Sequence, residues 1–270
     1  MRLGLTTAAF YGRLETEEAA ARLRALDVDC AEVFLQTPSE YSASFGETVK
    51  AALAGIPATS VHPLGTAFET SLFSPSRRQR ADAERLLEGV LCAAEAFGAR
   101  RYVYHGRSSA RGRRMEATFE QDAPRIEELC AAASAHGVRL CWENVSWCQL
   151  TSPERVRAVR RACPHVGFVL DVKQAMQSGF DAVEFAREMG DRLCNVHVCD
   201  FDASGRLCLP GRGIYDFAAL AMALRAAGYD GPVILEPYAN LFLEEAELAD
   251  SLAYLRKTME IASQKTANRV

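Results

Sequence analysis

Residues 139–171 read RLCWENVSWCQLTSPERVRAVRRACPHVGFVLD, which is two short apolar runs separated by a more polar segment. The first run, Arg139–Glu143, and the second, Gly167–Asp171, have the length and composition of parallel strands that are covered on both faces. Between them, Ser152 followed by Pro153 predicts the N-cap and the first position of a helix. The stretch therefore predicts a strand, a helix and a second strand in succession.

Eight short apolar runs of this kind recur along the chain, and longer segments separate them. The predicted strands are Arg2–Thr6, Cys30–Leu35, Ala58–His62, Arg101–His105, Arg139–Glu143, Gly167–Asp171, Cys194–Val198 and Val233–Glu236. Helical spacing of apolar residues is clearest in Thr16–Leu26, Arg77–Phe97, Ala117–Ala135 and a last segment near Glu244–Ile261. Gly98, Gly137 and Gly228 stand where helices should end, each just before a new strand.

Eight strand-and-helix units in 270 residues predict an α/β fold, namely a single (β/α)8 TIM barrel that spans residues 1–270. The rival fold is a doubly wound open sheet. That fold usually has a glycine-rich fingerprint after its first strand, and Thr6-Thr7-Ala8-Ala9 has none. No linker or low-complexity run suggests a second domain.

The composition is that of an ordinary globular protein, with 49% hydrophobic and 24% charged residues. Its 31 basic and 35 acidic side chains leave a formal charge of −4, which offers no basic field to a nucleic acid. No apolar run reaches the roughly 18 residues that a membrane span requires. We therefore expect a soluble, cytoplasmic protein that binds neither nucleic acid nor membrane.

The nine cysteines are scattered and form no C-x-x-C pair, which argues against a zinc knuckle or a thioredoxin-type motif. Most of them lie in apolar runs, as Cys141 does between Leu140 and Trp142. We expect buried, reduced, structural thiols, which fit a reducing cytoplasm.

Six consecutive predicted strands end on or near an ionisable side chain. In chain order these side chains are His62, His105, Glu143, Asp171, His197 and Glu236. Catalytic groups of a barrel lie at the carboxyl ends of its strands, so these side chains should share one rim. Three carboxylates at one barrel mouth would repel one another unless a cation is present.

The set Glu143, Asp171, His197 and Glu236 predicts a site for one divalent metal ion, because it is hard and mostly made of oxygen ligands. Mn²⁺ is the first choice, and Mg²⁺, Co²⁺ or Zn²⁺ also suit it. Such an ion polarises a carbonyl and its neighbouring hydroxyl and favours an enediolate, while two carboxylates remove and return the proton. For His62 the residues alone leave two readings open, a substrate contact or a part of the rim structure, and the same holds for His105.

The chain resembles the xylose isomerase-like TIM barrels, which include sugar phosphate isomerases and epimerases, tagatose 3-epimerase-type enzymes and endonuclease IV. The motifs that carry the resemblance are Trp142-Glu143-Asn144, Leu170-Asp171-Val172, Asn195-Val196-His197-Val198-Cys199-Asp200, Pro210-Gly211-Arg212-Gly213-Ile214-Tyr215-Asp216-Phe217 and Leu235-Glu236-Pro237. In this order they extend over nearly the whole chain. They are loose one by one, and they do not specify a substrate.

The resemblance implies that Glu143, Asp171, His197 and Glu236 hold one divalent metal ion. It also implies that Glu143 and Glu236 are the catalytic acid/base pair, and that His62 lies near substrate oxygens.

The chain departs from the family pattern at two places. Gln174 stands where the family often has a histidine, and it can donate a hydrogen bond but cannot act as an acid or base. Tagatose 3-epimerase-type enzymes have an arginine where this chain has Ala203, and Arg206 or Arg212 are candidates to replace it. Arg212 lies between two glycines, and two readings of these glycines are open. Either they let the backbone approach a bound anion, or the loop needs the unusual backbone angles that glycine allows. Lys173 is either solvated or attracts an anionic substituent.

The predicted function is that of a metal-dependent isomerase or epimerase of a sugar or sugar phosphate, which works by proton transfer through a metal-bound enediolate. The substrate is expected to be a small sugar or a polyol-derived carbonyl compound. An inosose dehydratase-like lyase on the same site is the first alternative. An endonuclease IV-like DNA repair nuclease and a non-catalytic sugar-binding protein are more remote. Homo-oligomer assembly is left open, because no predicted helix displays an interface.

Overall fold

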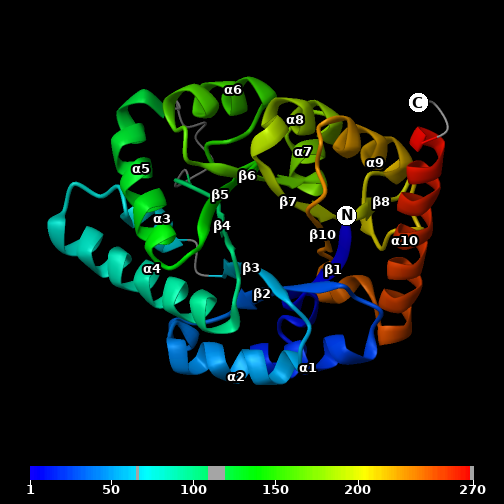
Figure 1. The fold of residues 1–270 in the computed structure, drawn as a ribbon, viewed down its shortest axis with the longest axis horizontal. Coiled ribbons are helices and arrows are strands. Elements are labelled where there is room, and N and C mark those ends of the chain that lie inside the picture. Colours follow the sequence, from blue (N-terminus) through cyan, green and yellow to red (C-terminus); the bar gives the residue numbers. More distant parts are fainter. Residues whose placement is uncertain (65–66, 109–118, 268–270) are drawn as a thin grey trace.

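The computed structural model describes residues 1–64, 67–108 and 119–267. Eight parallel strands form a closed barrel in the order β1-β10-β7-β6-β5-β4-β3-β2, and helices surround it (Figure 1). The barrel strands are β1 (Arg2–Thr6), β2 (Cys30–Leu35), β3 (Ala58–Pro63), β4 (Arg101–Tyr104), β5 (Arg139–Glu143), β6 (Gly167–Asp171), β7 (Leu193–Val198) and β10 (Pro232–Leu235). The predicted (β/α)8 barrel is therefore confirmed.

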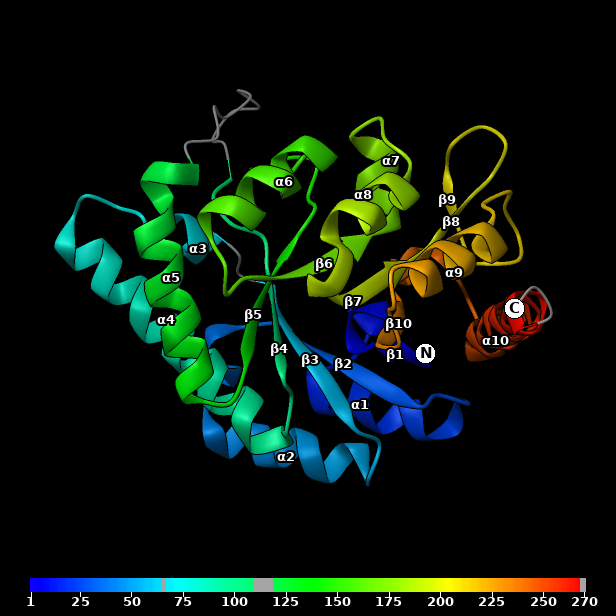
Figure 2. The same ribbon diagram turned by 45° about the horizontal axis from the view of Figure 1, so that its top comes forward.

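The helices follow the strands along the chain and pack outside them (Figure 1). They are α1 (Thr16–Arg22), α2 (Ala43–Leu53), α3 (Ala67–Ser71), α4 (Arg77–Phe97), α5 (Phe119–Ala135), α6 (Pro153–Ala162), α7 (Val172–Gln177), α8 (Ala182–Met189), α9 (Phe217–Ala226) and α10 (Glu245–Ala267). A two-stranded antiparallel hairpin, β8 (Asp200–Phe201) with β9 (Leu207–Cys208), follows β7 and lies beside α9 (Figure 2).

Four of the eight strands have the predicted boundaries, and the other four differ from them by one residue at one or both ends. Two differences affect the site, because β4 ends at Tyr104 and β10 ends at Leu235. His105 and Glu236 are therefore the first residues after their strands, where a side chain can turn into the barrel mouth. The first two residues of the helix predicted over Ala117–Ala135 lie outside the described residues.

Two helix ends confirm the glycine signal. Gly98 after α4 has a φ of 86° and Gly137 after α5 has a φ of 67°, a left-handed conformation that glycine adopts without strain. The helix predicted over Thr16–Leu26 ends earlier than expected, because Leu23–Ala25 continues as a 3-10 turn, a common end for a short helix.

Six of the cysteines are buried, as expected of structural thiols. Cys92, Cys194 and Cys208 are only half-buried, which the sequence did not indicate. Within the described ranges, every helix is too short or too polar to cross a membrane.

Candidate active site

A cavity of about 430 Å³ opens at the carboxyl ends of the barrel strands, the end at which barrels of this kind carry their active sites. Its lining includes both aromatic and ionisable side chains: Ala8, Tyr11, Phe34, His62, Pro63, Leu64, His105, Glu143, Trp147, Asp171, Lys173, Gln174, Glu236, Pro237 and Tyr238. Most of the site residues predicted from the sequence are in this lining. His197 is buried beside it, with 1% of its surface exposed.

The structure brings the four predicted metal ligands together. Glu143 ends β5, Asp171 ends β6, His197 lies near the end of β7, and Glu236 follows β10. One ligand atom from each lies within 4.8 Å of the others, and all four residues are buried or nearly so. Adjacent parallel strands bring these ends to one rim, since Asp171 and His197 are direct partners in the register of β6 and β7.

His197 is held in one orientation by Glu32, a carboxylate that the sequence analysis missed. The Nε2 atom of His197 lies 2.9 Å from Oε2 of Glu32, which is fully buried in β2. The Nδ1 atom lies 2.8 Å from Oε1 of Glu143 and 3.6 Å from Oε2 of Glu236. If Nε2 donates to Glu32, the lone pair of Nδ1 faces two carboxylates, and that arrangement requires a proton or a cation between them.

Glu32 is itself fixed by two neighbours. Ser60 donates its hydroxyl to Oε2 of Glu32 at 2.7 Å, and the amide of Asn195 donates to the same atom at 2.9 Å. The one sequence signal for Glu32 is a carboxylate inside the otherwise apolar strand Cys30–Leu35. A buried charge of this kind needs a partner, but the sequence does not name it.

The charges of the site are not balanced among the protein groups. Burial raises the pKa of Asp171 to about 7, against the opposing effect of Lys173, and the nearby carboxylates Glu236 and Glu143 raise it further. Burial would also raise the pKa of Glu143, but His105 and His197 lower it well below its usual range. The site thus forces one carboxyl group toward its neutral form. A divalent cation would remove that cost, so the donor set fits a metal ion.

The side-chain ammonium group of Lys173 lies beside the carboxyl groups of Asp171 and Glu236. Its Nζ atom lies 3.2 Å from Oε2 of Glu236 and 3.5 Å from Oδ2 of Asp171, and 4.8 Å from the ring centre of Tyr238. Burial opposes its charge, but Asp171 and Glu236 raise the pKa of Lys173 well above its usual range. Lys173 is therefore a buried ammonium ion, and the solvated alternative is wrong.

Gln174, which stands where the family often has a histidine, is fixed by hydrogen bonds to its neighbours. Its side-chain oxygen accepts hydrogen bonds from the backbone nitrogen of Ser146 at 3.0 Å and from the Ser146 hydroxyl at 2.7 Å. Its own backbone nitrogen donates to Asp171, which caps α7. A hydrogen bond from Gln174 to a ligand would therefore come from its side-chain NH2 group.

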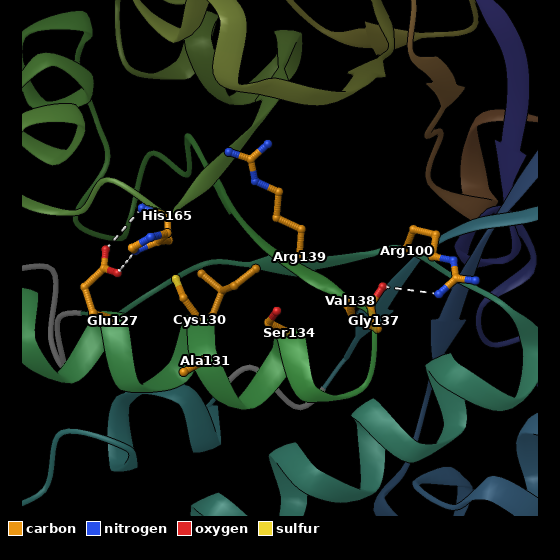
Figure 3. A pocket seen from close by; sticks show the side chains of 10 residues that line it. Arg100, Glu127, Cys130, Ala131, Ser134, Gly137, Val138, Arg139 and His165 are labelled. Atoms are coloured by element: carbon orange, nitrogen blue, oxygen red, sulfur yellow. Dashed lines mark hydrogen bonds and ion pairs between the residues drawn. The ribbon is translucent and has the colours of Figure 1, made fainter.

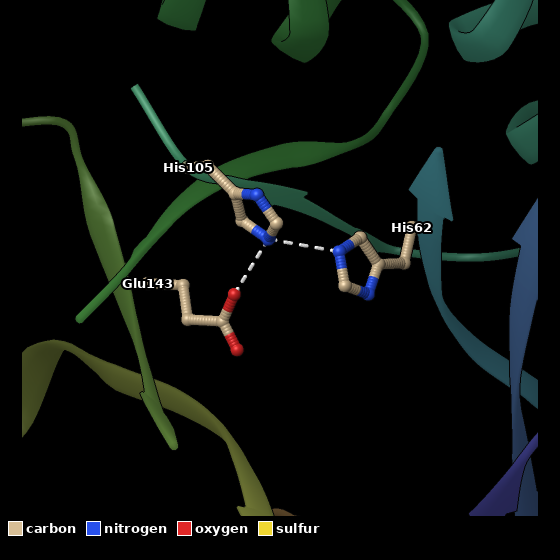
Figure 4. Close-up of side chains that lie close together, drawn as sticks. All are labelled: His62, His105 and Glu143. Atoms are coloured by element: carbon tan, nitrogen blue, oxygen red, sulfur yellow. Dashed lines mark hydrogen bonds and ion pairs between the residues drawn. The ribbon is translucent and has the colours of Figure 1, made fainter. Parts of the chain in front are cut away.

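His105 contacts both His62 and Glu143, which lie on either side of its ring (Figure 4). The two Nε2 atoms lie 2.9 Å apart, and Nε2 of His105 lies 2.7 Å from Oε2 of Glu143. The other nitrogen of His62 lies 3.6 Å from Oε1 of Glu236. Both histidines therefore touch the groups of the site, and ligand atoms of His62, His105 and Glu143 also satisfy the spacing of a metal-binding group.

Glu69 of α3 fixes the backbone at His105 and was also missed. Its carboxylate accepts hydrogen bonds from the Tyr102 hydroxyl at 2.7 Å and from the backbone nitrogens of His105 at 3.0 Å and Gly106 at 3.2 Å. Burial raises the pKa of Glu69 to about 7. The sequence offered no signal for it, because its partners lie more than thirty residues away.

Arg206 and Arg212 are not in the described lining of the cavity. Arg206 pairs with Asp202, at 3.0 Å from Nε to Oδ2, and Arg212 pairs with Glu247 at 2.6 Å. Their contact with a substrate stays a prediction. The glycine beside Arg212 has a structural role, because a Cβ on Gly213 would lie 2.3 Å from a carboxylate oxygen of Asp200.

A larger hollow of about 600 Å³ lies at the opposite end of the barrel, along α5 (Figure 3). It is lined in part by Gly137, Val138 and Arg139, at the start of β5. His165 there is paired with Glu127. This hollow has none of the converging carboxylates of the barrel mouth, so the smaller cavity is the candidate active site.

Solved structures with the same fold include D-psicose 3-epimerase from Clostridium cellulolyticum H10, with a TM-score of 0.79 and 18% identity over 96% of this chain and 99% of that one. A 3-keto-D-glucoside 4-epimerase from Escherichia coli matches with a TM-score of 0.73 and 21% identity, over 95% and 99%. The IolI protein, solved with a bound zinc atom, matches with a TM-score of 0.71 and 16% identity, over 98% and 99%.

Among curated sequences, uncharacterized proteins of Mycobacterium tuberculosis and Mycobacterium bovis are 31% identical over 98 residues. The match covers 34% of this chain and 35% of each relative, so it spans about a third of their length. A family model described as xylose isomerase-like TIM barrel matches residues 20–258, which is most of the chain. This chain belongs to the xylose isomerase-like TIM barrel family.

Proposed function

We propose that this protein is a divalent-metal-dependent isomerase or epimerase of a small sugar or sugar phosphate. The observation that carries the proposal is the group Glu143, Asp171, His197 and Glu236, whose ligand atoms lie within 4.8 Å of one another beside an open cavity. The family membership and the sugar epimerases among the similar structures support the substrate class.

These four residues would hold one divalent ion, and Mn²⁺ is the first choice for three carboxylates and one imidazole. When bound, such an ion draws electrons from the carbonyl and hydroxyl oxygens of a sugar and makes the neighbouring C–H more acidic. Glu32 sets the ring of His197, so that Nδ1 rather than Nε2 faces the site.

The proton transfer falls to Glu143 and Glu236. Both carboxylates line the cavity, so a substrate in it can reach them. In the proposed reaction, one carboxylate takes the proton from carbon and the other group returns a proton to the opposite face, which inverts the centre. Phe34, Tyr11 and Trp147 contribute aromatic surface that excludes water from the sugar.

Lys173 and the two histidines are proposed to hold substrate oxygens. Lys173 presents a buried ammonium group, His105 presents an imidazole paired with Glu143, and His62 presents an imidazole that contacts His105.

A first experiment tests the metal ion. Purified protein from manganese-supplemented medium should contain about one manganese ion per chain at the barrel mouth, and the double variant Glu143→Ala, Asp171→Ala should lose it. Elemental analysis of both proteins measures this. An unchanged metal content in the double variant, or none in either protein after reconstitution, would refute the proposed site.

A second experiment tests the reaction. Incubation with a panel of ketoses, aldoses and inososes in D₂O, followed by NMR, should give deuterium at one carbon with the carbon skeleton retained. Loss of water from the substrate would instead support the inosose dehydratase-like lyase, which uses the same groups. The endonuclease IV-like alternative has one observation in its favour, the His62–His105–Glu143 group, and predicts nearly three zinc ions per chain with EDTA-sensitive cleavage of an abasic-site duplex.

A further inference from the structure

A second group of potential ligands lies on the outer surface, far from the cavity in the chain and in the fold. Glu88 and Cys92 are one turn apart on α4, and His136 is the first residue after α5. One ligand atom from each lies within 4.8 Å of the others. None of the three lines the cavity at the barrel mouth. We call Glu88, Cys92 and His136 the helix group.

The spacing of the helix group matches the edges of a small coordination tetrahedron. Nε2 of His136 lies 3.2 Å from Oε1 of Glu88, and Sγ of Cys92 lies 3.7 Å from the same oxygen. Around a tetrahedral zinc ion, with Zn–S near 2.3 Å and Zn–N or Zn–O near 2.1 Å, neighbouring ligand atoms are about 3.4–3.6 Å apart. These two distances therefore differ from the tetrahedral values by only a few tenths of an ångström, roughly, and all three ligand atoms lie within 4.8 Å of one another.

His136 is also oriented as a metal ligand would be. Its Nδ1 atom lies 2.8 Å from Oε2 of Glu95, so a carboxylate holds the nitrogen that faces away from the helix group. Metal-binding histidines usually have such a partner, which fixes the tautomer and the ring. His136 follows the end of α5, where the partial negative charge of the last carbonyl groups favours a cation.

We propose that Glu88, Cys92 and His136 bind one zinc ion, with water as the fourth ligand, and that the ion ties α4 to the end of α5. A thiolate, an imidazole and a carboxylate form a softer donor set than the barrel mouth group. Such a set binds zinc in preference to manganese or magnesium. The proposal does not depend on the reaction proposed above.

The site is open enough to load from solvent. The side chain of Glu88 is 60% exposed and that of His136 is 16% exposed. Binding forms the Zn–S bond and releases the proton of the Cys92 thiol to water.

Cobalt reports on this site directly, because a thiolate ligand gives cobalt a charge-transfer absorption in the near ultraviolet. The full chain is first loaded with Mn²⁺ and then titrated with Co²⁺. We expect one equivalent of cobalt to produce the thiolate band, and zinc to bleach it. The barrel mouth group cannot produce this band, since its four ligands include no cysteine.

Two variants and two matched controls identify the ligands. Cys92→Ser should remove the band, and His136→Asn should remove or strongly weaken it. The controls are Cys208→Ser, which changes another half-buried cysteine, and His165→Asn, which changes another histidine paired with a glutamate. Both controls should keep the full band.

Glu95→Gln gives a graded test, because it removes only the partner of His136. It should weaken cobalt and zinc binding by about tenfold to a hundredfold, as loss of such a partner usually does. A wild-type protein that shows no thiolate band at saturating cobalt would overturn the proposal, and so would a band that persists in Cys92→Ser.

Discussion

The barrel mouth group and the helix group use the same local arrangement in opposite surroundings. In each, a carboxylate holds one nitrogen of a histidine: Glu32 lies 2.9 Å from His197, and Glu95 lies 2.8 Å from His136. The other nitrogen of His197 faces Glu143 and Glu236, and the other nitrogen of His136 faces Glu88. The barrel mouth group is buried and comes from four strands, whereas the helix group is partly exposed and comes from two helices.

The surroundings decide what each group costs and what it can bind. At the barrel mouth, charges are removed from water, so carboxylates interact strongly and the pKa of Asp171 rises to about 7. On the surface, water screens the same kind of contact, and the group adds little to stability until a cation binds. Burial thus suits the barrel mouth group to the catalytic role proposed above, and partial exposure suits the helix group to the structural role proposed for it.

The largest expected effect tests whether the barrel mouth is catalytic. Glu143→Gln keeps the shape of the side chain but removes its ability to exchange a proton. With saturating metal ion, turnover of a substrate found by the D₂O screen should fall by about a hundredfold to ten thousandfold. Glu47→Gln, an exposed carboxylate on α2, is the control and should keep full activity. Full activity in Glu143→Gln would remove the acid/base role.

The second prediction concerns pH, and it tests the effect of burial. The pKa of Glu69 is about 7 in the folded protein and near 4.5 when unfolded, so the folded state binds the proton more tightly. The protonated Glu69 makes its full contribution to the free energy of unfolding below about pH 4.5. That contribution, about 3 kcal/mol at most, is lost as the pH rises through 7.

Glu69→Gln should lack this loss, since glutamine stays neutral. Chemical unfolding of both proteins in EDTA at pH 5 and pH 8 measures it. The stability of the wild type relative to the variant should be lower at pH 8 than at pH 5. An equal difference at both pH values would mean that Glu69 ionises normally.

The third prediction tests whether Glu32 supports metal binding through its contact with His197. Glu32→Gln should weaken manganese binding by about tenfold to a hundredfold, because the ring of His197 loses its charged partner. Glu40→Gln is the matched control, since Glu40 is also a buried carboxylate but is bonded to Thr16 and Gln36. Manganese titration of both variants tests the prediction, and equal affinities would contradict it.

The smallest effect is expected on the surface. His136→Asn should lower the stability of the metal-free protein by at most about 1 kcal/mol, because exposed ion pairs contribute little. Denaturant unfolding in EDTA measures this. A loss near 3 kcal/mol would show that the helix group is part of the packing between α4 and α5, and the contrast with the barrel mouth would fail.

The sequence indicated most of the barrel and much of its mouth. Apolar runs of strand length, helical spacing and glycines at helix ends are local signals, and they identified all eight strands to within about two residues. Parallel strands of a barrel have their carboxyl ends on one rim. Side chains at those ends were therefore expected to meet without any knowledge of their partners.

Local signals failed where a contact depends on packing. Glu32 faces His197 because the closed barrel brings the interior of β2 opposite β7, and Glu69 reaches His105 because α3 folds back over β4. Neither contact follows from spacing along the chain. Nor does the scatter of the cysteines along the chain indicate that Cys92 is half-buried near His136, which follows a separate helix.

The sequence by itself therefore determined the eight strand-and-helix units and the four groups at strand ends, because short-range hydrophobic patterns and strand direction suffice for both. Only the tertiary structure decided which carboxylate orients which histidine, that Lys173 is buried beside Asp171 and Glu236, and that Arg206 and Arg212 pair with surface acids. The physical reason is that the contacts of Glu32 with His197, Lys173 with Glu236 and Arg212 with Glu247 depend on barrel closure and helix packing, which join residues far apart in the chain, while the near pair Arg206–Asp202 depends on the shape of its loop.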